Sequence, residues 1–99
     1  MKVRPVQIAD LEVAVRVLLH ADAKFRASLI TRICDEAMIA DKYRKKLGRQ
    51  HPTFGNGTLM SAAARYNAVG RPAACDAEYL SCLSQIIGRL LANSDHHIA

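Results

Sequence analysis

The chain has 99 residues, which fits one domain with one hydrophobic core and is too short for two. Hydrophobic residues make up 51% of it but aromatic residues only 5%, so aliphatic side chains must supply most of the core, a composition that favours helices. The formal net charge of +5 favours an anionic partner over a cationic one.

The cysteines and the start of the chain bear on its compartment. The three cysteines, Cys34, Cys75 and Cys82, form no Cys-x-x-Cys pair, and an odd number fits poorly with a disulfide framework. The first ten residues, MKVRPVQIAD, lack the apolar core of a signal peptide, and no apolar run approaches the roughly 18 residues of a membrane span. These features predict a cytoplasmic protein with reduced thiols and no membrane contact.

The first two predicted helices cover residues 10–20 and 23–47. Asp10 is a suitable N-cap for the first, since apolar residues recur after it at helical spacing. Gly48 is a natural stop for the second. A helix of about 25 residues is about 37 Å long, against a radius of gyration of about 13 Å for a compact chain of this size. We therefore expect its last two turns, from Asp41 onward, to project past the core or to contact a partner.

The third and fourth helices are predicted over residues 58–67 and 76–92. Thr58 and Asp76 are the expected N-caps, because each precedes a run with helical periodicity. The fourth helix carries the most regular apolar stripe of the chain, which is typical of a core helix.

Together these elements predict an all-α fold, with residues 1–99 forming a single compact four-helix domain. The helices pack as an orthogonal or irregular bundle, and residues 1–6 and 93–99 are expected to fray at its ends. The residues expected to dominate the core are Leu11, Val15, Leu18, Phe25, Leu29, Ile33, Leu59, Leu80, Leu83, Ile87 and Leu90.

The excess positive charge is concentrated in the middle of the chain. Residues 1–41 hold six basic and six acidic residues, whereas residues 42–75 hold seven basic residues and no carboxylate. Such a region can contact the phosphates of a nucleic acid or an acidic protein surface. The same charges at a helix C-terminus also complement the helix dipole without any partner. The residues predicted to bind an anionic partner are Lys42, Arg44, Lys45, Lys46, Arg49 and Arg65.

The Gly-Asn-Gly-Thr run before the third helix is a second candidate site. Free backbone N–H groups and a hydroxyl at a helix start can bind a phosphate or carboxylate. The run matches neither a P-loop nor a dinucleotide-binding fingerprint, and a glycine turn that ends in a Thr cap explains it without a ligand. The residues of this candidate anion site are His51, Gly55, Gly57 and Thr58.

The sequence offers no set of catalytic residues. His51 is a candidate ligand or acid–base group, but no carboxylate between Lys42 and Cys75 can orient it, so hydrogen bonding to the loop backbone is the favoured role. His96 and His97 would need metal ligands from elsewhere in the chain. We therefore predict no catalytic residue, no metal, no cofactor and no enzymatic activity.

Three segments of the chain stand out together, namely RPVQIADLEVA at the start, DKYRKKLGRQHPTFGNGTLMSAAA in the middle and DAEYLSCL near the end. In these segments the chain resembles a family of short uncharacterised bacterial helical proteins. Members of that family begin with Arg-Pro-Val, carry a His-Pro turn followed by Gly-x-Gly-Thr-Leu-Met-x-Ala-Ala, and end in an Asp-x-x-Tyr helix. The resemblance implies an all-helical fold and carries over no activity, ligand or catalytic residue.

The function predicted from the sequence is that of a non-enzymatic binding or adaptor module. Its basic surface, residues 42–71, would contact an anionic protein or a nucleic acid. Two alternatives stay open. One is the binding of a small anion or phosphate ligand at the start of the third helix. The other is a structural subunit that forms a homodimer through the second or the fourth helix.

Overall fold

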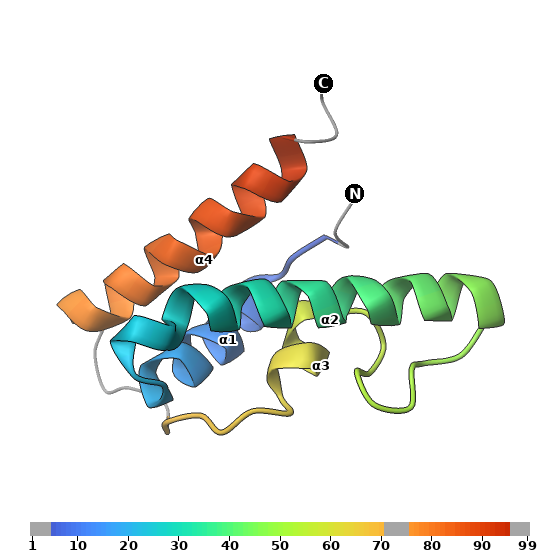
Figure 1. The fold of residues 1–99 in the computed structure, drawn as a ribbon, viewed down its shortest axis with the longest axis horizontal. Coiled ribbons are helices and arrows are strands. Elements are labelled where there is room, and N and C mark those ends of the chain that lie inside the picture. Colours follow the sequence, from blue (N-terminus) through green and yellow to red (C-terminus); the bar gives the residue numbers. More distant parts are fainter. Residues whose placement is uncertain (1–4, 71–75, 96–99) are drawn as a thin grey trace.

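The computed structural model describes residues 5–70 and 76–95, and they form the all-α bundle that the sequence predicts. The elements are α1 (Ile8–His20), a 3-10 turn (Ala23–Phe25), α2 (Arg26–Leu47), α3 (Leu59–Ala63) and α4 (Ala77–Asp95). The longest helix, α2, runs along the length of the molecule, with α1 and α3 beside it, and α4 crosses obliquely (Figure 1). The radius of gyration is 13.3 Å, the value expected for one compact domain of this length.

The start of α1 differs from the prediction. The helix begins at Ile8, and Gln7 rather than Asp10 is its N-cap. Asp10 is the third residue of the helix, and its Oδ2 accepts the Gln7 amide at 2.7 Å, which completes a capping box. The Asp10 side chain faces the interior, because the residue is only 3% exposed.

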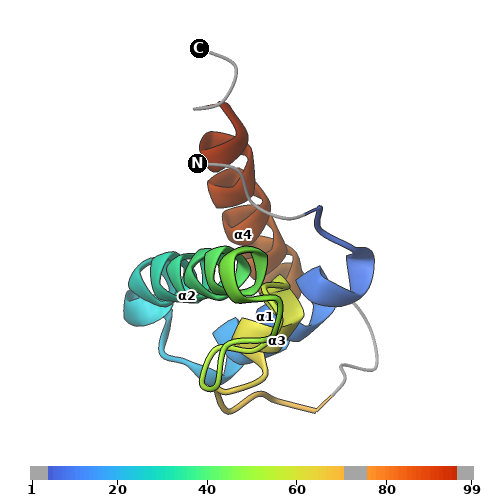
Figure 2. The ribbon, with the colours of Figure 1, turned by 90° about the vertical axis from the view of Figure 1, so that its right-hand side faces the viewer.

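The end of α2 agrees with the prediction, whereas its start is later. Gly48 ends the helix in the left-handed conformation, and its amide donates to the Arg44 carbonyl at 2.8 Å. The predicted first turn is instead the separate 3-10 turn before Arg26. The last two turns extend beyond α4, but the loop that follows covers their inner side (Figure 2). Asp41 is buried there, against Gly57 of that loop.

The third helix is only five residues long, shorter than the predicted span of 58–67. Thr58 is its N-cap, as predicted, and accepts the Ser61 amide. The chain leaves the helix early because Arg65 and Tyr66 turn toward α2, where both side chains bind Oε1 of Glu36 at 2.8 Å.

The core forms where α1, α2, α3 and the first half of α4 meet. Of the predicted core residues, Val15, Leu18, Ile33 and Leu59 are buried, and Leu11, Leu29, Leu83 and Leu90 pack partly buried against them. Small residues that the prediction omitted fill much of the remaining interior, namely Ala14, Cys34, Ala37, Ala40, Ala62, Ala63 and Cys82. Their size lets neighbouring helices approach closely.

Three predicted core residues are wrong. Phe25 is 55% exposed because it belongs to the 3-10 turn, outside the helical register that assigned it inward. Leu80 and Ile87 of α4 are 52% and 38% exposed, while Cys82 and Ile86 of the same helix are fully buried. A helix with apolar residues on several sides does not reveal by spacing alone which side is buried.

A buried arginine joins three of the helices. Arg26, at the start of α2, is 8% exposed, and its Nε donates to the Leu18 carbonyl at 2.7 Å. Its Nη2 contacts Oε2 of Glu78 on α4 at 3.1 Å. Since Leu18 lies in the last turn of α1, Arg26 caps the C-terminus of α1 and ties it to α4.

Candidate functional site

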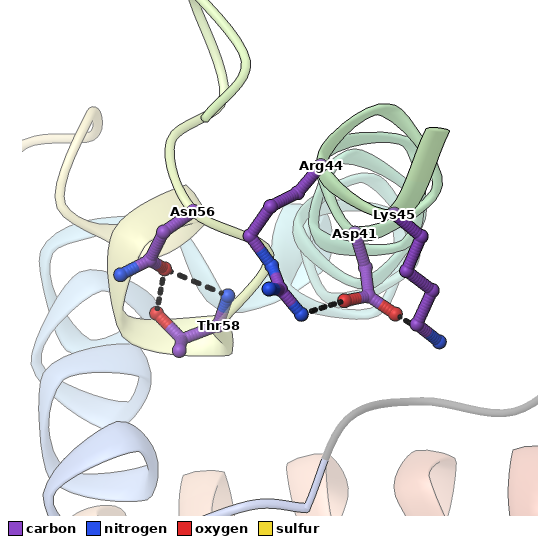
Figure 3. Close-up of polar contacts among 5 residues, drawn as sticks. All are labelled: Asp41, Arg44, Lys45, Asn56 and Thr58. Carbon is purple, nitrogen blue, oxygen red and sulfur yellow. Dashed lines mark hydrogen bonds and ion pairs between the residues drawn. The ribbon is translucent and has the colours of Figure 1, made fainter. Parts of the chain in front are cut away.

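Two of the six predicted partner-binding cations are held by one carboxylate of their own helix. Arg44 and Lys45 approach the two oxygens of Asp41 at 3.4 Å and 2.9 Å (Figure 3). Asp41 immediately precedes the stretch without carboxylates and sits at the i,i+3 and i,i+4 spacing that brings side chains together on a helix. Its buried carboxylate therefore offsets part of the charge that the sequence assigned to this end of α2.

A third cation, Arg65, is paired across the fold. Its Nη1 donates to Oε1 of Glu36 at 2.8 Å, and its guanidinium lies 4.8 Å from the centre of the Phe54 ring. Glu36 is 29 residues away along the chain, so no local pattern could have revealed the pair. Arg65 therefore fastens the end of α3 to α2, separate from the exposed cations at the end of α2.

The remaining predicted cations form the exposed surface that we call the basic end of α2, composed of Lys42, Lys46 and Arg49. All three are exposed. Lys42 and Lys46 are one helical turn apart and share a face, and Arg49 follows directly after the helix cap. Two apolar side chains of the same part of α2 are also exposed, Ile39 at 48% and Leu47 at 50%. Arg71, the last cation of the predicted basic region, lies outside the described residues.

A shallow hollow adjoins the basic end of α2. It has a volume of about 230 Å³ and is lined by Asp35, Met38, Ile39 and Lys42, which occupy one face of the helix. The lining combines two apolar side chains, Met38 and Ile39, with one carboxylate, Asp35, and one cation, Lys42.

Three rings lie in contact where the loop after α2 meets the last turns of that helix. The His51 ring lies parallel to that of Phe54, with centroids 4.7 Å apart, and Tyr43 meets His51 edge-on at 4.8 Å. The Nδ1 atom of His51 accepts the amides of Thr53 and Phe54, each at 3.0 Å. An imidazole that accepts at Nδ1 carries its hydrogen on Nε2. His51 thus organises its own loop, whose ends also pair through backbone bonds between His51 and Gly55.

Replacing His51 with alanine is expected to lower the free energy of unfolding by about 2 kcal/mol, since two backbone amides lose their acceptor and two rings lose a neighbour. Urea denaturation measures the change. The matched control is His20→Ala, because His20 is exposed at the end of α1. Equal effects of the two substitutions would contradict this role for His51.

The candidate anion site at the start of α3 is occupied by acceptors of the chain itself. Oγ1 of Thr58 accepts the Ser61 amide at 3.1 Å, and the Thr58 amide and hydroxyl both donate to Oδ1 of Asn56 (Figure 3). The Met60 amide donates to Oδ1 of Asp10 at 3.0 Å. An internal carboxylate therefore sits where an external anion was expected, and it arrives from α1, 50 residues away along the chain.

The two glycines of this segment serve turn geometry and close packing. Gly55 and Gly57 have φ values of +88° and +96°, which favour glycine. A Cβ atom at Gly55 would lie 2.5 Å from Oγ of Ser61, and one at Gly57 would lie 2.8 Å from the Cα of Asp41. The loop therefore packs against α2 and α3 through the four residues of the candidate anion site, His51, Gly55, Gly57 and Thr58.

The two cysteines in the described part of the chain are buried and free. Burial raises the pKa of the Cys34 thiol to about 11 and also raises the pKa of the Cys82 thiol. Both groups are therefore neutral thiols near pH 7 and serve as packing residues of the core. Cys75, His96 and His97 lie outside the described residues.

Within the described residues, 5–70 and 76–95, no three His, Cys, Asp or Glu side chains come together in a group that could hold a metal ion. In the same part of the chain, no helix combines the length and the apolarity needed to cross a bilayer.

Comparison with known protein families gives a match over most of the chain. Residues 4–90 match the family described as a domain of unknown function, DUF7742. The chain belongs to this family. The match spans the basic end of α2, the ring stack and the start of α3, so these features lie within the family domain. Searches of curated proteins and of solved structures gave no match.

Proposed function

We propose that the domain is a non-enzymatic binding module that uses the basic end of α2 to hold an acidic segment of another protein. The observation that carries the proposal is the grouping of Lys42, Lys46 and Arg49 with exposed Ile39 and Leu47 at one end of the molecule. Cations supply attraction and orientation, while exposed apolar side chains gain stability when a partner covers them.

Two observations favour a protein over a nucleic acid as the partner. Three exposed cations would displace few counterions, with an expected slope of about −3 in a plot of log affinity against log salt. The rings that a nucleic acid would need for base stacking, Tyr43, His51 and Phe54, instead contact one another. The proposal includes a cytoplasmic setting, which the free buried thiols of Cys34 and Cys82 support. It also includes a bacterial source, which the resemblance of the sequence implies.

The test reverses two charges at the basic end of α2. In Lys42→Glu plus Lys46→Glu, binding to a Glu- and Leu-rich helical peptide at about 50 mM salt should fall more than about tenfold, because attraction becomes repulsion. Isothermal calorimetry measures the affinity. The control, Lys24→Glu plus Arg32→Glu, changes the net charge equally at two exposed positions, one before α2 and one in its first half, and should bind like the natural protein.

The same titrations distinguish the partner classes. Equal loss in both double variants would show that only net charge matters, and it would contradict a site at the end of α2. Tighter binding of duplex DNA than of the peptide would overturn the protein partner in favour of a nucleic acid. A polyglutamate peptide that binds as well as the Glu- and Leu-rich one would remove the role of Ile39 and Leu47.

A further inference from the structure

The outward face of α4 carries large apolar side chains and, from residue 80 to residue 92, no charged side chain at an exposed position. Leu80, Ile87 and Leu91 are 52%, 38% and 60% exposed. The other exposed positions from residue 80 to residue 92 are Ser81, Ser84, Gln85, Gly88 and Ala92. In a chain with 14 basic and nine acidic residues, an exposed helical surface of this length without a charged side chain is typical of a contact surface.

The position of α4 makes this face accessible. Its first half packs on α1 and α2, and its second half extends away from the other helices (Figures 1 and 2). The buried side chains Cys82 and Ile86 point to the bundle, so the face with Leu80, Ile87 and Leu91 looks outward.

A glycine in the middle of this face, Gly88, has no packing neighbour in the described part of the chain. Glycine inside a helix is less stable than alanine by about 1 kcal/mol. A Cβ atom at Gly88 would meet nothing within 4 Å, so neither the helix nor its neighbours require glycine there. Close approach of a second backbone is a physical reason for a bare Cα at an exposed helical position.

The outward face is complementary to itself. On a helix, the residues three, four and seven positions before and after Ser84 lie on the same side as Ser84. Suppose that two α4 helices pair antiparallel and cross at Ser84. A residue n positions after Ser84 in one helix then lies opposite the residue n positions before Ser84 in the other helix. The facing pairs are then Leu80 with Gly88, Ile87 with Ser81, Leu91 with Ala77, and Ser84 with itself. Every large side chain faces a small one, and all seven positions are exposed in the single chain.

We propose that α4 is the interface for a second copy of this chain, with two α4 helices antiparallel about a two-fold axis at Ser84. The self-complementary pairing favours this occupant, because each large side chain of one α4 meets a small one of the other. The net charge of +5 opposes association of two copies, but the lack of charged side chains at the exposed positions from residue 80 to residue 92 keeps like charges out of the contact itself. The homodimer is independent of the proposed function, because the basic end of α2 takes no part in it.

A charge pair at the two-fold axis tests the arrangement. Ser84→Glu and Ser84→Lys each place like charges opposite one another and should raise the dimer dissociation constant more than about tenfold. An equimolar mixture of the two variants places opposite charges there and should restore the dimer. Sedimentation equilibrium measures the mass against the 10.9 kDa of a single chain. The control is Ser28→Glu, at an exposed position on α2, which should dimerise like the natural protein.

Gly88→Ala gives a second test that does not depend on a weakened fold. The methyl group stabilises the free helix, so the midpoint of thermal unfolding at low concentration should rise. The same methyl group separates the paired helices, so the dimer should weaken by about tenfold or more. The proposal is overturned if the natural protein keeps the single-chain mass at high micromolar concentration. It is also overturned if the natural protein dimerises and each Ser84 variant alone dimerises equally well, since the copies would then meet elsewhere. A mixture of the two variants that stays monomeric would overturn the two-fold axis at Ser84, since the two Ser84 residues would then not face each other.

Discussion

Gly57→Ala is expected to lower the free energy of unfolding by about 3 kcal/mol, which corresponds to a fall of roughly 15 °C in the unfolding midpoint of a domain of this size. Two effects add. At φ +96° an L-residue is strained, at a cost of about 1–2 kcal/mol. The new Cβ atom would also lie 2.8 Å from the Cα of Asp41, a backbone atom that can give way only if the loop and α2 separate. Overpacking of this kind costs about 1–3 kcal/mol.

Gly48→Ala is the matched control for Gly57→Ala. Gly48 also has a positive φ, +74°, but a Cβ atom there would meet nothing within 4 Å. This substitution should therefore cost only the conformational term, about 1 kcal/mol. Thermal and urea unfolding of both variants measure the difference. Equal losses in the two variants would show that the contact between Gly57 and Asp41 adds nothing to stability.

The parts of the fold that the sequence predicted correctly are those with local causes. Gly48 ends α2, Thr58 caps α3 and Asp76 caps α4, where its Oδ1 accepts the Tyr79 amide at 2.9 Å. Each of these signals involves a side chain and a backbone group within a few residues of each other. The fold class followed because four such segments with helical periodicity can bury their apolar faces only against one another.

Two of the errors in the predicted core, Leu80 and Ile87, arise because α4 carries apolar residues on several sides. On α4 the side that packs inward is decided by α1 and α2, so spacing alone assigned Leu80 and Ile87 to the core. Residues such as Ala62 and Ala63 become core residues because helices approach closely at small side chains. The predicted core did not include them.

The candidate site could be located but not described from the sequence. Its cations and glycines stand in one stretch of the chain, and the spacing of Asp41 before Arg44 and Lys45 could have revealed their ion pairs. The other acceptors, Asp10 and Glu36, come from distant segments. A stretch of sequence that lacks carboxylates can therefore still have carboxylates beside it in the folded protein, because tertiary packing brings them from distant segments.

The second large effect on the free energy of unfolding is expected at the Asp10 carboxylate. Its Oδ2 accepts the Gln7 amide at 2.7 Å and its Oδ1 accepts the Met60 amide at 3.0 Å, so one buried side chain joins the start of α1 to the start of α3. Asp10→Ala removes both acceptors and leaves two amides without a partner. Hydrogen bonds to charged groups contribute about 1.5–3 kcal/mol each, so the loss should be about 3 kcal/mol or more.

Asp10→Asn tests the contribution of the two hydrogen bonds without changing the size of the side chain. Asparagine keeps the shape, but its NH₂ group must face one of the two amides, so about 2 kcal/mol should be lost. Hydrogen exchange at the Met60 amide reports on its bond to Asp10, because this amide should exchange faster in Asp10→Ala. The urea midpoint of Asp10→Ala should also be lower. Asp35→Asn, at an exposed position on α2, is the control and should change stability by less than about 0.5 kcal/mol. If Met60 exchange is unchanged in Asp10→Ala, the carboxylate does not hold α3, and the start of this helix would again be open to an external anion.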